Sequence, residues 1–195
     1  GDQSRIYKKR LKDRPVAPSY TIRPERREDY DEIYDLIKTA FASARVKDGD
    51  EQDFAAKLRE RGGFIPELAL VAELDEKTVE GGMLIGHIML TKTYIEQPDG
   101  SLFEVLLVAP LSVLPGYRDA GVGAALMRES LNKAKHMGYK AIMLVGDPSY
   151  YSRFGFRSVT GSGIRPKGDI PLQFVQVCEL VPGVLEGVTG IADCC

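Results

Sequence analysis

The segment 105–145 constrains the fold of this 195-residue chain more than any other part of the sequence. It begins with the continuous apolar run 105–108, which lacks the alternation of a half-exposed strand, so we expect a central strand covered on both faces. Amphipathic spacing over 121–137 then predicts a helix, and the apolar residues 141–145 predict a second buried strand. This order is a β-α-β crossover, which indicates a parallel strand pair inside an α/β fold.

Hairpin strands and two helices precede this unit. Helical spacing predicts helices over 29–42 and 51–61, and Asp29 followed by Glu32 resembles a capping box for the first of them. Pro98-Asp99-Gly100 is a hairpin signal. Strands are expected at 20–23, 68–73, 83–94, Leu102–Val113, 141–145 and, as the last strand, 173–180, with a short helix at 148–154.

Pro110 lies inside the expected strand Leu102–Val113. A proline has no N–H for the strand ladder and is tolerated inside a sheet only where a bulge or a splay interrupts the pairing. We therefore predict an irregularity in the sheet at this residue.

Composition excludes several classes of protein. With 44% hydrophobic and 28% charged residues the chain is too apolar for a disordered protein, and a net charge of −2 provides no overall field for nucleic acid. No apolar run approaches the roughly 20 residues that span a bilayer, so no membrane partner is expected. We divide the chain into a basic tail at 1–19 and a single domain at 20–195. The basic run 5–14 is interpreted as part of a solvated tail, with a nucleic-acid arm as the alternative.

The cysteines and histidines do not form a metal motif. Cys178, Cys194 and Cys195 lack Cys-x-x-Cys spacing, so neither a zinc site nor a disulfide framework is expected, and a reducing cytoplasm fits this usage. His87 lies in an expected strand and is interpreted as a satisfied sheet histidine, with a water relay as the alternative. His136 lies in the last turn of a helix, where a cation suits the helix dipole.

Two glycines, Gly121 and Gly123, separate the central strand from the following helix. Without Cβ atoms, their backbone N–H groups can converge, and the helix N-terminus adds unpaired donors and a partial positive charge. The result is an anion cradle suited to a pyrophosphate. A P-loop requires Gly-Lys-Ser/Thr, whereas Gly123 precedes Ala124, and a Rossmann fingerprint requires a glycine where Leu126 stands. A turn whose glycines serve packing alone is the remaining alternative.

Three motifs in a fixed order carry a family resemblance. They are Thr21-Ile22-Arg23-Pro24, the stretch Val113-x-Pro115-x-Tyr117-Arg118-x-x-Gly121-Val122-Gly123, and Tyr150-Tyr151-x-x-Phe154-Gly155-Phe156. The second resembles the Arg/Gln-x-x-Gly-x-Gly/Ala signature for acetyl-CoA of the GNAT N-acetyltransferase superfamily, and the others resemble its first strand and its late Tyr-x-x-x-Gly-Phe signature. The resemblance covers about residues 20–181. It is closest to the bacterial YhbS-like branch of that family, on the combination of Ala109-Pro110-Leu-Ser-Val113 with Gly146-Asp-Pro-Ser-Tyr-Tyr-Ser-Arg-Phe-Gly-Phe156.

The resemblance implies a splayed mixed sheet, largely antiparallel, of about seven strands flanked by about four helices. It also implies that acetyl-CoA binds with its pantetheine arm in the splay, as acyl-donor substrate and without a metal. Strand backbone groups would hold the arm, and N–H groups of the glycine turn would hold the pyrophosphate. By position these residues are Leu111, Val113 and Leu114 for the arm, and Arg118, Ala120, Gly121, Val122, Gly123 and Ala124 for the pyrophosphate.

The resemblance also implies a catalytic residue. The family's leaving-group acid lies four residues before the glycine of Gly-Phe, which is Tyr151 here, and a phenol near pKa 10 can protonate a thiolate. Packing beside coenzyme A is the alternative role. The general base is open, because Leu107 stands where some members have a glutamate, and Glu104 points to the other face. Ordered water, helped by Asp147 or an acidic residue of the acceptor side, is the remaining route.

The expected function is an N-acetyltransferase that moves an acetyl group from acetyl-CoA to a primary amine by direct attack. A covalent cysteine intermediate is not expected, because the central motifs hold no cysteine. The alternative is a degenerate acyl-CoA-binding sensor. The acidic residues Asp48, Asp50, Glu51 and Asp53 either start a solvated helix or help to bind a cationic amine. Members of the family often dimerise, so a homodimer is a candidate assembly.

Overall fold

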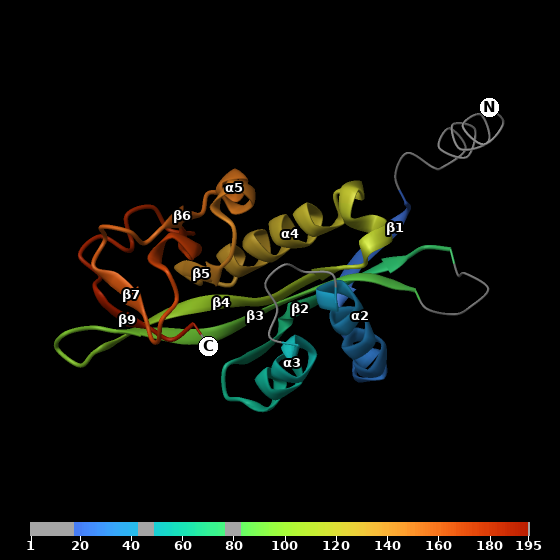
Figure 1. The fold of residues 1–195 in the computed structure, drawn as a ribbon, viewed down its shortest axis with the longest axis horizontal. Helices are drawn as coiled ribbons and strands as arrows, with labels where there is room; N and C mark the ends of the chain where they lie inside the picture. The colour runs from blue at the N-terminus through green and yellow to red at the C-terminus, as the bar shows by residue number, and fades with distance from the viewer. Residues whose placement is uncertain (1–17, 43–48, 77–82, 195) are drawn as a thin grey trace.

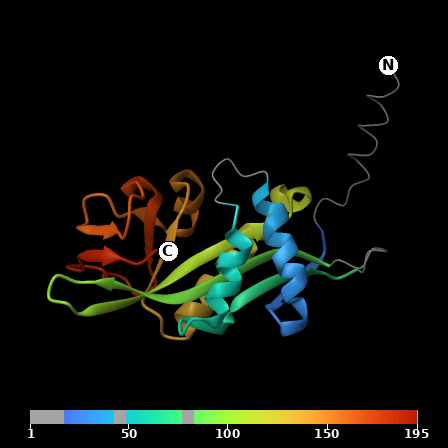
Figure 2. The same cartoon turned by 60° about the horizontal axis from the view of Figure 1, so that its bottom comes forward.

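A computed structural model of the protein describes residues 18–42, 49–76 and 83–194. Residues 1–17 lie outside the described part of the chain. They include the basic run 5–14 and most of the tail predicted at 1–19. The described residues form a single sheet with helices packed on both of its faces (Figures 1 and 2).

Nine strands of the described chain belong to this sheet, in the order β1-β2-β3-β4-β5-β8-β6, with β9 beside β3 and β7. Neighbouring strands are antiparallel except for the parallel pairs β4–β5 and β7–β9. The predicted mixed, largely antiparallel fold is therefore confirmed. The strands are β1 Tyr20–Pro24, β2 Phe64–Leu74, β3 Leu84–Glu96, β4 Leu102–Val113, β5 Ala141–Val145, β6 Arg157–Ser158, β7 Ile164–Pro166, β8 Val175–Glu179 and β9 Gly190–Ala192.

The helices divide between the two faces of the sheet. Helices α2, Tyr30–Ala42, and α3, Glu51–Glu60, lie on one face, and α4, Val122–His136, lies on the other (Figure 1). Helix α4 buries Leu126 and Met127 completely in the core. The short helix α5, Pro148–Tyr151, follows β5, and 3₁₀ turns occupy Arg27–Asp29, Pro115–Ala120, Ser152–Phe154 and Leu172–Phe174.

Strands β4 and β5 pair over a short distance and then separate. Their register holds two pairs, Leu106 with Ile142 and Leu107 with Met143, although β4 continues to Val113. On the other edge of β4 the pairing with β3 shifts at Pro110, because Ile88 pairs with Leu111 and Leu90 with Val108. The irregularity predicted from Pro110 is thus a bulge beside the point where the sheet opens.

Two local predictions are wrong. Strand β9 follows β8, so 173–180 is not the last strand; a three-residue strand is too short for its pattern to stand out in sequence. Glu32 does not close a capping box with Asp29. Its carboxylate accepts hydrogen bonds from the N–H groups of Met83 (3.2 Å) and Leu84 (3.1 Å), while Asp29 pairs with Arg23. A long-range contact replaces the local one.

Candidate active site

The glycine turn presents unpaired backbone donors at the start of α4. Gly121 is the N-cap residue and has φ +78°, a left-handed conformation that favours glycine. The N–H groups of the next three residues, Val122, Gly123 and Ala124, belong to the first helical turn and have no acceptor within the helix. Because Gly121 has no side chain to cap them, these donors and the positive helix end remain available to an anion.

A cavity of about 550 Å³, here called the glycine-turn cavity, opens in front of these donors. A Cβ atom at Gly123 would lie 3.2 Å from the Tyr150 hydroxyl, so a larger residue would narrow the cavity. Two guanidinium groups and one carboxylate border it, which gives it a positive balance. Its lining is Leu111, Val113, Arg118, Asp119, Gly121, Gly123, Ala124, Tyr150, Tyr151 and Arg153.

A second cavity of about 360 Å³, here called the splay cavity, occupies the opening between β4 and β5. It shares Leu111 and Tyr151 with the glycine-turn cavity, so the two cavities adjoin at these residues. Most of the side chains that line it are apolar. Its lining is Phe41, Glu51, Phe54, Leu107, Val108, Ala109, Pro110, Leu111, Leu144, Val145, Tyr151 and Cys194.

Tyr151 stands where the cavities meet. Its ring lies against Gly146, where a Cβ atom would come within 2.5 Å of the ring, and packs edge-on against Tyr150 (4.9 Å between centroids) and Phe156 (6.2 Å). Burial, together with the negative charges that Tyr150 and Asp147 can carry, raises the pKa of Tyr151 to about 12. The phenol therefore stays protonated at neutral pH and is a proton donor rather than a base.

The other residues expected at the cofactor site do not all face a cavity. Leu111, Val113, Arg118, Gly121, Gly123 and Ala124 do. Leu114 uses both backbone groups inside the fold, because its N–H donates to Ile85 (2.9 Å) and its carbonyl accepts from Tyr117 (2.9 Å). Val122 is fully buried, and Ala120 packs against the core on the α4 side, so either can offer only its backbone.

Arg118 has a second attachment. Its side chain donates a hydrogen bond to the carbonyl of Ala40, near the end of α2. The glycine turn is thereby connected to the helical layer on the opposite face of the sheet, and the sequence offered no signal for this contact.

The candidate bases are placed as follows. Leu107 lines the splay cavity as an apolar group, and Glu104 is exposed opposite Tyr94, away from it. Asp147 is exposed and caps α5, accepting hydrogen bonds from the Ser149 N–H and hydroxyl at 2.9 Å, which lower its pKa. Its position on the surface and its capping role argue against general base catalysis. His136 bonds the carbonyl of Asn132 (2.8 Å) within its own helix, as expected of a structural residue.

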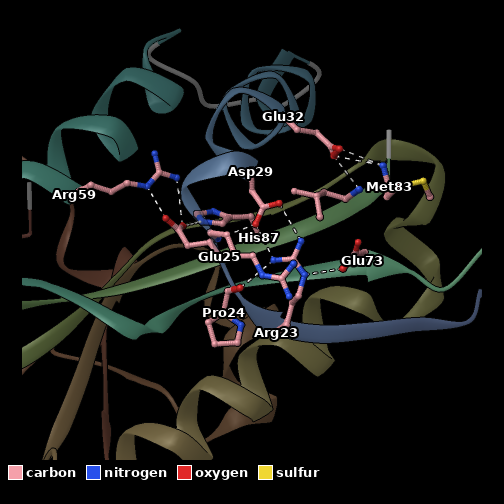
Figure 3. A network of polar contacts seen from close by, with 11 residues as sticks. Arg23, Pro24, Glu25, Asp29, Glu32, Arg59, Glu73, Met83 and His87 are labelled. Carbon is pink, nitrogen blue, oxygen red and sulfur yellow. Dashed lines mark hydrogen bonds and ion pairs between the residues drawn. The ribbon is translucent and has the colours of Figure 1, made fainter. Parts of the chain in front are cut away.

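His87 belongs to a separate polar cluster, shown in Figure 3, and lines neither cavity. Its Nε2 lies 2.8 Å from Glu25 Oε1, and Arg59 Nε donates to Glu25 Oε2 at 2.7 Å. Burial lowers the pKa of His87 more than Glu25 raises it, so His87 is neutral with its proton on Nε2. For Glu25, burial raises the pKa, but the hydrogen bonds from His87 and Arg59 together lower it. His87 is therefore a structural sheet residue, but it is not the fully satisfied histidine that the sequence predicted, because its buried Nδ1 has no hydrogen-bond partner among the described residues.

The sequence interpretation missed several cavity residues. Phe41 and Phe54 come from α2 and α3, and Cys194 follows β9, yet all three line the splay cavity. Arg153 joins the glycine-turn cavity, with its Nε bonded to the Tyr150 carbonyl (2.8 Å). These residues have no local motif, and only the pairing of distant elements brings them to the site.

Two expected absences concern metals and membranes. Within residues 18–42, 49–76 and 83–194, no group of three or more His, Cys, Asp or Glu side chains could hold a metal ion. In the same ranges, none of the helices is long and apolar enough to cross a membrane.

Comparison with known proteins identifies the family. The model of the acetyltransferase (GNAT) domain matches residues 21–159, which include the glycine turn and Tyr151. The chain belongs to the GNAT acetyltransferase family. Among GNAT proteins, YhbS of Escherichia coli K12, described as an uncharacterized N-acetyltransferase, is 33% identical over 146 residues, which cover 73% of this chain and 82% of that protein. The predicted similarity to the YhbS-like branch is confirmed.

Solved GNAT structures share the whole fold. The structure of Escherichia coli YhbS in complex with CoA matches with a TM-score of 0.78 and 31% identity, covering 92% of this chain and 91% of that one. A GNAT acetyltransferase from Brucella melitensis in complex with acetyl-CoA matches with a TM-score of 0.70 and 28% identity, covering 89% and 94%.

Proposed function

We propose that the protein transfers the acetyl group of acetyl-CoA to a primary amine, with direct attack of the amine on the thioester. The observation that carries this proposal is the junction of the two cavities at Leu111 and Tyr151. One cavity offers anion donors, the other lies in the opening of the sheet, and a proton donor stands between them. The bound CoA and acetyl-CoA of the two solved relatives support the same ligand.

In the proposed arrangement the pyrophosphate binds the N–H groups from Val122 to Ala124, with Arg118 and Arg153 near the phosphates. The pantetheine arm follows the edge of β4 at Leu111 and Val113, which β5 leaves without a partner after Leu107. The thioester then reaches the splay cavity. The backbone groups of Leu114 are omitted from this proposal because both are used within the fold.

The chemical step needs one proton donor and one proton acceptor. The amine nitrogen bonds to the thioester carbon, the C–S bond breaks, and the Tyr151 hydroxyl gives its proton to the departing sulfur. The attacking nitrogen loses a proton to ordered water, because Leu107 supplies no base, and Tyr151 regains its proton from solvent. Tyr151 fits the donor role because its raised pKa keeps the phenol protonated.

Thermal unfolding with acetyl-CoA, CoA and NAD, combined with an assay of CoA thiol release, tests the proposal. At 100 times its Kd a ligand of the native state adds about 2.7 kcal/mol of stability, so acetyl-CoA and CoA should raise Tm while NAD should not. A protein that ignores both CoA compounds would refute the proposal. Stabilisation without thiol release for any amine would instead support the acyl-CoA sensor, which Leu107 at the base position favours.

A further inference from the structure

A further cavity of about 200 Å³, here called the β3 cavity, adjoins the splay cavity. The two share Leu107, whereas the β3 cavity and the glycine-turn cavity have no lining residue in common. Because Arg61 and Tyr94 in its wall are exposed, the β3 cavity opens to solvent. Its lining is Leu58, Arg61, Gly63, Thr91, Lys92, Thr93, Tyr94, Leu107 and Asp193.

The splay cavity therefore has a neighbour on each side of the proposed reaction. The thioester would arrive from the glycine-turn cavity, past Leu111 and Tyr151. The β3 cavity offers a separate approach, past Leu107, for the acceptor. An acceptor that enters by this route leads with its amine, and its other end stays among the residues of the β3 cavity.

Arg61 is the cation that faces this approach. It is the residue after the last turn of α3, and its guanidinium lies 5.7 Å from the centroid of the Phe54 ring, which lines the splay cavity. Arg61 forms no ion pair with a carboxylate of the described residues. A guanidinium stays charged at physiological pH, and its fork of donors matches the two oxygens of a carboxylate.

The other charged residues around these cavities have different places. Side chains alternate between the faces of a strand, and Lys92 pairs with Leu106 of the core beneath α4, so its side chain points to the α4 face. Asp193 in the β3 cavity and Glu51 in the splay cavity already have interaction partners, and neither is assigned a role. Arg61 is thus the charged group left for a ligand in the β3 cavity.

Thr91 adds a hydroxyl beside the junction of the cavities. It pairs with Leu107 across β3 and β4, and cross-strand partners have Cβ atoms about 5 Å apart on one face of the sheet. Thr91 is 3% exposed, and its hydroxyl makes no hydrogen bond to another described residue. Thr93 differs, because its hydroxyl donates to the Asp193 carbonyl at 2.7 Å. The Thr91 hydroxyl is therefore a donor that a ligand in the cavity can use.

We infer that the acceptor is a small amino acid, bound with its carboxylate on Arg61 and Thr91 and with its amine past Leu107, at the thioester. This inference rests on the proposed acetyl transfer and names its substrate class. The chemical step is unchanged: the amine loses its extra proton to water and bonds to the thioester carbon, the C–S bond breaks, and Tyr151 protonates the sulfur. The residues of the β3 cavity touch the far end of the acceptor and leave the nitrogen free to attack.

A carboxylate fits this wall better than a phosphate does. A phosphate group carries between one and two negative charges at neutral pH, up to about twice that of a carboxylate, and the wall has one cation for it. One guanidinium and one hydroxyl match the charge and the acceptor oxygens of a single carboxylate.

The test measures kcat/KM at saturating acetyl-CoA for glycine, β-alanine, 4-aminobutyrate and 6-aminohexanoate, each beside its amide. The amide keeps the chain length and the amine but loses the negative charge. The best amino acid should exceed its amide by about 10-fold or more, the contribution of a hydrogen bond to a charged group. Arg61→Gln should remove this preference while turnover of the amide persists, and Arg61→Lys should fall between. Comparing the same two acceptors in each variant cancels their difference in amine basicity.

Two further variants separate recognition from packing. Thr91→Val keeps the shape of the side chain, removes the hydroxyl and should lower the preference by about 3- to 10-fold. Lys92→Gln is the matched control, since Lys92 is exposed and borders the cavity from a strand position that faces α4; it should keep the wild-type preference. Urea unfolding checks that Arg61→Gln, at an exposed helix end, folds as wild type does.

Titration of the best amino acid into the CoA complex measures recognition without turnover, and binding that Arg61→Gln weakens by about 10-fold supports the inference. Equal kcat/KM for amino acids and amides, or a preference that Arg61→Gln leaves unchanged, overturns it. So does a higher kcat/KM for 1,4-diaminobutane, which a dominant Asp193 carboxylate would favour, or for 2-aminoethyl phosphate. These outcomes leave acetyl transfer intact. Failure of acetyl-CoA to raise Tm, or no thiol release with any amine, would instead remove the proposed function itself.

Discussion

The splay cavity and the cluster of Glu25, Arg59 and His87 lie on different parts of one sheet, and both contain buried titratable groups with shifted pKa values. In the cluster, Glu25 is held between two partners, and its side chain is 2% exposed. At the cavity, the hydroxyl of Tyr151 makes no hydrogen bond to another described residue and faces space large enough for a ligand. The hydrogen-bond partners of these groups, rather than their pKa shifts, distinguish a structural group from a candidate catalytic one.

The two regions are nevertheless connected through α3. Arg59 joins this helix to Glu25, and its guanidinium lies 4.0 Å from the centroid of the Tyr30 ring on α2. The other end of α3 carries Glu51 and Phe54 to the splay cavity. The cluster thus anchors the helix whose opposite end lines the splay cavity.

The largest expected effect tests the cavity side of this comparison. Tyr151→Phe removes the hydroxyl while keeping the ring against Gly146, so kcat should fall by roughly 100- to 10,000-fold, the range of general acid catalysis. Affinity for CoA and the unfolding free energy should change little, because the hydroxyl has no hydrogen bond among the described residues to lose. Steady-state kinetics, CoA titration and urea unfolding provide the three readouts. An unchanged kcat would assign Tyr151 to packing.

The cluster should respond in the opposite way. Glu25→Ala leaves Arg59 and His87 buried without their acceptor and should lower the unfolding free energy by about 3–5 kcal/mol. Urea unfolding measures this loss. Exposed Glu28, on the following turn, is the control, and Glu28→Ala should stay within about 0.5 kcal/mol of wild type. A loss of the same size in both variants would mean that the cluster contributes nothing special.

The glycine turn can be tested with a control residue in the same helix region. Gly121 and Gly138 bracket α4, both have positive φ (78° and 89°), and a Cβ atom added at either residue would have no neighbouring atom within 4 Å. Alanine at either residue should cost about 1–2 kcal/mol of backbone strain. Gly121→Ala alone should also weaken CoA binding, since it distorts the donors that face the cavity. Equal CoA affinity in both variants would contradict the assignment of the pyrophosphate.

The smallest expected effect is the pH dependence of stability. Burial lowers the pKa of His87 in the folded state, so the unfolded chain binds a proton first as the pH falls. Stability is therefore fully present above the unfolded pKa near 6.5 and decreases below it by at most about 1.4 kcal/mol per pH unit for one group. Glu25, whose pKa is also lowered, adds a loss of the same sign below about pH 4.5.

Urea unfolding between pH 7.5 and 5 follows the histidine contribution. His87→Gln keeps a donor for Glu25 but does not titrate, so its profile should be flatter than that of wild type over this range. Identical slopes would place the acid sensitivity in other groups.

Local chemistry made the backbone of the site predictable. Apolar periodicity, the hairpin signal and the glycines defined most helices and strands, because these depend on neighbours along the chain. Pro110 predicted its bulge for the same reason, since a missing N–H interrupts pairing wherever the residue lies in a sheet. Resemblance to the GNAT signature then assigned the turn to acetyl-CoA and Tyr151 to the leaving group.

What the sequence by itself determined is the order of the longer elements, the glycine turn at Gly121 and the position of the sheet irregularity. Only the tertiary structure decided which side chains surround the opening: Glu51, Phe41 and Cys194 come from segments far apart in the chain. It also decided that Glu32 bonds the backbone at Met83 and that His87 bonds Glu25. Turns and periodic patterns arise from adjacent residues, whereas a cavity wall and a buried charge pair exist only once distant elements pack.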